Sequence, residues 1–248
     1  MSGKIRVALL MLATFTASTW ACFDTFLFLQ RGSMVYPYRT LAVEALGEYS
    51  FNAIKDPESD SFLGNFNLYY GLFRKASFQI GFGSSEKERH NFSIDEIRAR
   101  GVYNLVNIPQ KGYTLDGILE CSNNSRSNEL NFEISAPSIF VAQGFVLVLH
   151  PVLNIVHGSN TDFTAGGHAG VFRVFENATL LGIGAEYQSA QSSSYKQRLV
   201  KGESAASIFF GARIGKYLFL QNELAKGLAN SRDFGFASTL KFVFGGQK

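Results

Sequence analysis

The sequence His157-Gly158-Ser159-Asn160 places a general base two residues away from a nucleophile. Residues i and i+2 of an extended strand point to the same face, so the His157 imidazole could deprotonate the Ser159 hydroxyl. A catalytic triad also needs a third group that orients the histidine. Gly-Ser-Asn is also a favourable turn sequence. We therefore expect a loop tip here, and no enzymatic activity.

His150 and His168 are the next candidates for chemistry, because imidazole is a common metal ligand. The two histidines are well separated in the sequence, and neither has partners at ligand spacing around it. We expect both to be solvated side chains, and we expect no metal site and no cofactor.

The elements that would position these residues are strands. In residues 204–227, SAASIFFGARIGKYLFLQNELAKG, Ile208 and Phe210 share one face of an extended chain, and Arg213 lies on the other. After Gly215-Lys216, Leu220 and Glu223 again fall on opposite faces. A two-residue link that contains glycine is a hairpin signal. The stretch therefore predicts a β-hairpin with one apolar and one polar side.

The same alternation recurs from residue 40 to the end of the chain, and no comparable stretch has helical periodicity. It predicts about twelve antiparallel strands, within a range of roughly ten to fourteen, each near the length of a tilted membrane-spanning strand. Most links alternate between short turns and longer polar loops, although residues 136–144, APSIFVAQG, do not fit this pattern. Aromatic residues cluster near both strand ends, as at two membrane interfaces. The fold class predicted is all-β, a single antiparallel transmembrane β-barrel with both termini periplasmic. A soluble β-sandwich or lipocalin-like barrel is the alternative.

Composition agrees with a membrane barrel. Charged residues make up 17% of the chain, below the average of roughly 25% for soluble domains. The net charge of +3 argues against binding of nucleic acid. Beyond residue 21, no apolar run approaches the roughly 18 residues of a membrane-spanning helix.

Residues 1–21 have the charged, apolar and small-residue regions of a signal peptide, with a cleavage site after Ala21. Residues 22–38 would form a lead-in, a plug or an extra strand, and residues 39–248 the barrel. Thr-Trp-Ala-Cys is only weakly similar to a lipidation signal at Cys22. Cys121, on an apolar face, is expected to remain free.

In a membrane barrel the polar faces of the strands line the lumen. Opposite charges there could cross-link and close a narrow interior, or could line a small pore with a mild cation preference. The charged residues assigned to the lumen are Glu44, Glu48, Glu96, Arg98, Arg100, Asp116, Glu120, Glu133, Glu186, Arg213, Glu223 and Lys241.

The last strand resembles the C-terminal signal of the bacterial outer-membrane β-barrel protein class. Phe236, Leu240, Phe242 and Phe244 alternate towards a terminal aromatic residue, although residues 245–248 follow it. The resemblance implies export to the outer membrane of a Gram-negative bacterium, contact with its lipid, and recognition by the barrel-assembly machinery.

The resemblance to this class does not fix the function. We expect a narrow porin-like channel for ions or small polar solutes. The alternative is a closed structural barrel that acts through its extracellular loops. A third reading is a lipid hydrolase using His157 and Ser159, because His-x-Ser-Asn is similar to the order in outer-membrane phospholipase and lipid A deacylase barrels.

Overall fold

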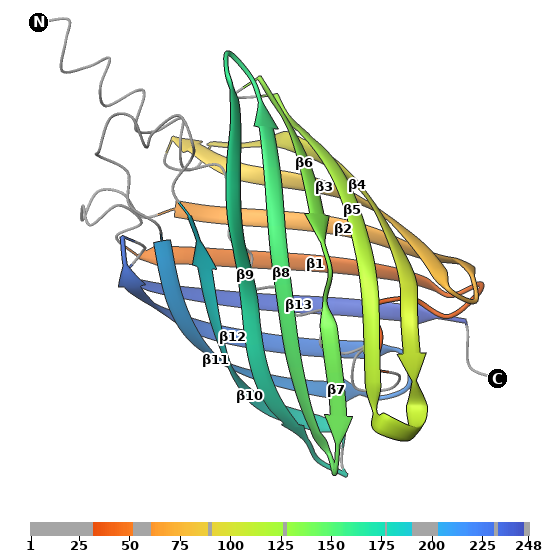
Figure 1. Cartoon of the computed structure of the whole chain (residues 1–248). Coiled ribbons are helices and arrows are strands. Elements are labelled where there is room, and N and C mark those ends of the chain that lie inside the picture. Colours follow the sequence, from red (N-terminus) through yellow and green to blue (C-terminus); the bar gives the residue numbers. More distant parts are fainter. Residues whose placement is uncertain are drawn as a thin grey trace, which may run out of the picture.

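The computed structural model describes residues 32–51, 61–88, 91–125, 128–176, 178–189, 203–230 and 233–245. Most of them lie in antiparallel strands that wrap into one barrel (Figure 1). The strands are β1 (Leu41–Phe51), β2 (Ser61–Phe73), β3 (Ala76–Glu88), β4 (Asn91–Ile108), β5 (Tyr113–Asn124), β6 (Glu129–Ser135), β7 (Ser138–Ala142), β8 (Phe145–His157), β9 (Thr161–Val174), β10 (Thr179–Gln188), β11 (Glu203–Ile214), β12 (Leu218–Ala229) and β13 (Phe234–Phe244). A 3-10 turn, η1 (Pro109–Lys111), joins β4 to β5. Within these described ranges, no helix is long and apolar enough to cross a membrane.

The barrel has twelve strand positions, because β6 and β7 share one position between β5 and β8. It closes where β1 pairs with β13, from Leu41 opposite Phe244 to Phe51 opposite Phe234. Closure leaves no free edge on the sheet. A strand in lipid needs a partner on both sides, because lipid cannot form hydrogen bonds with its backbone N–H and C=O groups. The predicted single antiparallel barrel of about twelve strands is confirmed.

The break between β6 and β7 explains the stretch that did not fit the pattern of links. Pro137 has no backbone N–H to donate, so the ladder is interrupted there. Neighbouring groups cover the gap: the Ala136 N–H donates to the carbonyl of Pro151 on β8 at 3.3 Å, and the Asp116 N–H donates to the Pro137 carbonyl at 3.0 Å. Most of residues 136–144 therefore belong to β7, and the link to β8 is only the turn Gln143-Gly144, with φ of 49° and 79°.

The short turns gather at one end of the barrel, which we call the short-turn end. They are residues 74–75, 109–112, 143–144, 175–178 and 215–217. The start of β1 and the finish of β13 lie at the same end, since Leu41 pairs with Phe244. We call the opposite end the loop end.

Large apolar side chains cover the outside of the barrel. Phe210 is 46% exposed, whereas its neighbour Phe209 is 1% exposed and points inward. Tyr70, Tyr103 and Tyr187 lie near strand ends and are also exposed on the outside. Exposure of such side chains is costly in water and favourable in lipid, so this outer surface is built for a bilayer.

The described residues before β1 form no strand, and the first part of them lies inside the barrel. We call Gly32–Thr40 the N-terminal segment. Its turn is closed by the Thr40 N–H, which donates to the Pro37 carbonyl at 2.9 Å. Met34, Val35 and Tyr36 are 5%, 7% and 1% exposed, so this part of the segment fills the lumen rather than crossing the barrel mouth. Residues 1–31, with the predicted signal peptide and Cys22, lie outside the described residues.

Candidate functional site: the barrel lumen

The structure places the charged residues that we assigned to the lumen on the inner face of the barrel. The alternation along each strand explains this, because every second side chain points inward. The buried ones are Glu44, Glu48, Arg98, Asp116, Glu120, Glu186, Glu223 and Lys241. Glu96, Arg100, Glu133 and Arg213 are half-buried.

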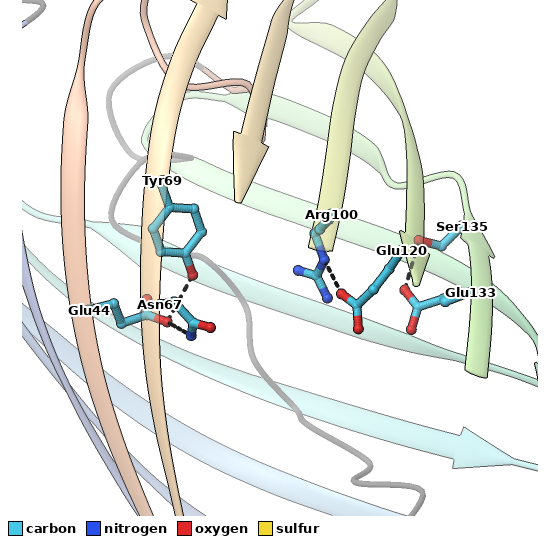
Figure 2. A network of polar contacts seen from close by, with 7 residues as sticks. All are labelled: Glu44, Asn67, Tyr69, Arg100, Glu120, Glu133 and Ser135. Carbon is cyan, nitrogen blue, oxygen red and sulfur yellow. Dashed lines mark hydrogen bonds and ion pairs between the residues drawn. The ribbon is translucent and has the colours of Figure 1, made fainter. Parts of the chain in front are cut away.

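Glu44 on β1 is the centre of a buried polar network (Figure 2). The Lys241 Nζ lies 2.7 Å from the Glu44 Oε2, and both side chains are at most 5% exposed. The Asn67 amide and the Tyr69 hydroxyl each donate to the Glu44 Oε1 at 2.8 Å. A buried charge is tolerated only when it is paired and hydrogen-bonded. This network therefore binds β13, β1 and β2 together from the inside.

A second charged group lies on β4, β5 and β6 (Figure 2). Arg100 forms an ion pair with Glu120, its partner in the strand register. Glu133 is in turn the register partner of Glu120 and accepts a hydrogen bond from the Ser135 hydroxyl at 3.2 Å. Glu133 therefore places a second carboxylate next to the Arg100–Glu120 ion pair on this part of the lumen wall.

His150 and His168 lie beside each other, which sequence spacing did not indicate. They are register partners on β8 and β9, with ring centroids 5.6 Å apart. Glu186 on β10 pairs with His168, and its Oε2 lies 3.9 Å from the His168 Nδ1. Both histidines are half-buried rather than freely solvated. Within the described part of the chain, no three His, Cys, Asp or Glu residues form a group that could hold a metal ion.

Arg213 and Glu48 have local partners on the inner face. The Arg213 guanidinium donates to the carbonyls of Gly215 and Lys216 at 3.2 and 2.9 Å, so it caps the β11–β12 turn. Glu48 accepts a hydrogen bond from the Ser50 hydroxyl at 3.1 Å.

Apolar side chains fill the lumen at the short-turn end, and this was not predicted. Met34 and Val35 pack in one buried cluster with inward-pointing residues from seven strands, which we call the apolar cluster. Its strand members are Val102, Ile118, Ile139, Val146, Val148, Phe172, Leu180 and Phe209. An open water-filled lumen would leave these side chains hydrated, so their burial means that the lumen is closed at this level.

Hydrogen bonds and aromatic contacts hold the N-terminal segment in place. The Ser33 hydroxyl and the Met34 N–H donate to the Asp116 Oδ2 at 2.9 and 2.6 Å. Tyr36 stacks on Tyr69 with 4.6 Å between the ring centroids, and its hydroxyl oxygen accepts a hydrogen bond from the Lys241 ammonium at 3.0 Å. The segment is therefore joined to both the apolar cluster and the Glu44 network.

The His157–Asn160 stretch lies outside the lumen, at the loop end. The Gly158 N–H donates to the Asn160 carbonyl at 2.9 Å, and the His157 Nδ1 lies 2.8 Å from the Thr161 hydroxyl. His157 and Ser159 are both exposed. The stretch is a tight turn between β8 and β9, in which the imidazole is engaged by Thr161.

Two further predicted features lie on the outer face. Phe236, Leu240, Phe242 and Phe244 on β13 are between 37% and 46% exposed. Cys121 is a free, half-buried cysteine, next but one to the exposed Leu119.

The architecture can now be compared with known proteins. No protein-family model matches the sequence, and no curated protein matches it. Among solved structures, an outer-membrane channel from Pseudomonas putida F1 is similar with a TM-score of 0.63 and 12% identity, covering 86% of this chain and 97% of that one. The NanC porin is similar with a TM-score of 0.62 and 7% identity, covering 81% and 98% of the two chains.

The chain has the fold of outer-membrane β-barrel proteins. The KdgM porin, solved in complex with disordered oligogalacturonate, is a further match, with a TM-score of 0.60, 9% identity, and 82% and 99% coverage. At these identities the likeness of this barrel to porins and channels is one of fold. The resemblance to the outer-membrane barrel class is confirmed at that level, and no specific family is assigned.

Proposed function

We propose that this protein is a narrow, non-enzymatic channel of the bacterial outer membrane that passes ions or small polar solutes. The observation that carries the proposal is the polar lumen wall between the apolar cluster and the loop end. Glu120, Glu133 and Arg100 there are charged groups of both signs on neighbouring strands. A wall of fixed charges and amides can replace part of the hydration shell of a passing ion.

Three features support placement in the outer membrane. The outer surface is apolar, the solved structures with a similar fold include porins and channels, and residues 1–21 have the pattern of a signal peptide. In this proposal the exposed apolar face of β13 contacts lipid and is first recognised by the barrel-assembly machinery.

The second candidate is a closed structural barrel that acts through its extracellular loops. One observation favours it: the apolar cluster and the N-terminal segment fill the lumen at the short-turn end. A channel must open at this level, whereas a structural barrel needs no opening.

Conductance across planar lipid bilayers separates these two functions. We expect discrete openings from the folded full-length protein, with a preference for cations because acidic side chains outnumber basic ones among the charged residues of the inner face. Folded protein that never conducts, over a wide range of voltage, would contradict the channel and favour the structural barrel. A second assay of phospholipid cleavage by wild type and Ser159→Ala tests the hydrolase reading, for which we expect no activity from either.

A further inference from the structure

The N-terminal segment is attached to the barrel wall at one fixed point next to β1. The Arg39 N–H donates to the Gly71 carbonyl at 2.8 Å, and the Gly71 N–H donates to the Thr40 carbonyl at 2.9 Å. A Cβ on Gly71 would lie 1.8 Å from the Pro37 carbonyl oxygen, so the turn lies flat against the β2 backbone. Arg39 has a φ of 61°, in the left-handed region that a non-glycine residue seldom adopts. This turn is the base about which the rest of the segment can swing.

Residues Gly32–Tyr36, beyond this base, are held without any strand pairing. The Asp116 carboxylate on β5 accepts hydrogen bonds from the Ser33 hydroxyl and the Met34 N–H. Its other oxygen accepts one from the Asn104 amide at 2.7 Å. All three donors are neutral, and the Asp116 side chain is fully buried. Water can take the place of the two donors from the segment, so release exposes the carboxylate to solvent without leaving it unsatisfied. Asp116 therefore has the properties of a reversible latch.

Tyr36 connects the segment to the charged part of the lumen. The Lys241 ammonium lies between the Tyr36 hydroxyl at 3.0 Å and the Glu44 carboxylate at 2.7 Å. A solute or ion that competes for Glu44 or Lys241 would weaken the contact with Tyr36. The lumen charges and the segment are in this way physically coupled.

We propose that residues Gly32–Tyr36 are a displaceable gate, closed in this structure by the apolar cluster and by the Asp116 latch. The inference rests on the proposed channel function and adds its regulation. When the gate is released, Met34 and Val35 leave the apolar cluster and the lumen becomes continuous from the loop end to the short-turn end.

A cross-link across the latch tests the gate in the full-length protein. Ser33→Cys with Asp116→Cys, in a Cys22→Ser and Cys121→Ser background, puts two thiols where the hydroxyl and carboxylate now touch. We expect the oxidised pair to be silent in bilayers, and the reduced pair to open more often than wild type because the latch is gone. Ser33→Cys alone is the control and should not respond to the redox cycle. An oxidised pair that conducts like wild type, with the disulfide verified by mass, would overturn the gate.

A second measurement follows the segment without any current, which separates failure of the gate from failure of the channel. In the same cysteine-free background, Met34→Cys reacts with a water-soluble methanethiosulfonate only when the segment leaves the cluster. Asp116→Asn should raise this labelling rate roughly tenfold, because hydrogen bonds to a charged acceptor are lost. Ser33→Ala, a milder change, should raise it less.

Asp95→Asn provides the matched control, because Asp95, on β4, is likewise a buried acid but lies towards the loop end. It should leave the labelling rate of Met34→Cys unchanged. Labelling that is equally slow in all folded variants would refute the gate whatever the conductance. Accelerated labelling in Asp116→Asn, with no current from any variant, would support a movable segment and refute the channel.

Discussion

At the residue scale, buried charges of the lumen are stabilised by pairing with a charge of opposite sign. Lys241 is 1% exposed and its Nζ is 2.7 Å from the Glu44 carboxylate. Removal of one partner from such a pair leaves an uncompensated charge in a low-dielectric site, whereas removal of both leaves none. Glu44 and Lys241 therefore act mainly as a structural pair, and less as a free selectivity element.

Glu44→Gln should lower the free energy of unfolding by about 3–5 kcal/mol, because the Lys241 ammonium stays buried without its partner. The double variant Glu44→Gln/Lys241→Met should recover most of that loss. Urea unfolding of the barrel in lipid vesicles measures both. If the double variant were no more stable than the single one, the pair would not be the source of the effect.

Glu133 is the residue at which ion preference should be altered most directly. It stands beside the Arg100–Glu120 ion pair and supplies the second carboxylate. Glu133→Gln should reduce the cation preference of the channel, measured as a smaller reversal potential under a salt gradient, while Glu133→Asp should retain it. An unchanged reversal potential in Glu133→Gln would place the selective groups elsewhere in the lumen.

At the element scale, successive side chains along one strand point in turn to the lipid and to the lumen. Phe209 and Phe210 are neighbours on β11, yet one is 1% exposed and the other 46%. Phe210→Arg should destabilise the barrel by about 2–4 kcal/mol, because the guanidinium enters the apolar part of the bilayer. Phe210→Leu is the control and should cost far less. Refolding in vesicles gives both values, and equal losses would mean that Phe210 does not face lipid.

Because Gly182 on β10 has no side chain, the Phe209 ring has room to pack in the apolar cluster. A Cβ at position 182 would lie 2.4 Å from the Phe209 Cζ and 2.5 Å from the Phe172 Cβ. Gly182→Ala should therefore destabilise the barrel by about 1–3 kcal/mol through overpacking. Gly101→Ala provides the comparison, because nothing lies within 4 Å of the added methyl group, and it should be neutral or slightly stabilising. Similar unfolding curves for both variants would contradict tight packing on Gly182.

The strands could be predicted from sequence because one face of each is apolar and the other polar. That signal fades where both faces are apolar, as at Val146 and Leu147, so the inward residues of the apolar cluster went unrecognised. Met34 and Asp116 are 82 residues apart, and Met34 precedes the alternating strands, so their contact has no local signature. Pro137 could be recognised from the sequence as a break in a strand. The hydrogen bonds by which neighbouring strands bridge this break could not be predicted, because they form only in the assembled sheet.

At the scale of the whole molecule, the two ends of the barrel are built differently. The short-turn end holds the start of β1, the last residues of β13, the N-terminal segment and the apolar cluster, whereas the longer links emerge at the loop end. Turns of outer-membrane barrels lie in the periplasm and their long loops lie outside the cell. The gate would accordingly stand at the periplasmic side.

Epitope tags check this orientation. A tag inserted between β10 and β11, within residues 190–202, should bind antibody on intact cells. A tag after Lys248 should bind only once the outer membrane has been permeabilised, because β13 finishes at the short-turn end. Antibody binding to the C-terminal tag on intact cells would reverse the assigned orientation.

The apolar cluster has a consequence for a bacterium that carries this barrel in its outer membrane. That membrane is a permeability barrier, and every permanently open pore admits harmful small molecules along with useful ones. A barrel sealed by its own chain adds no such leak while it is at rest. In such a cell, the number of copies could rise without loss of the barrier, and uptake would be set by how often the seal is broken.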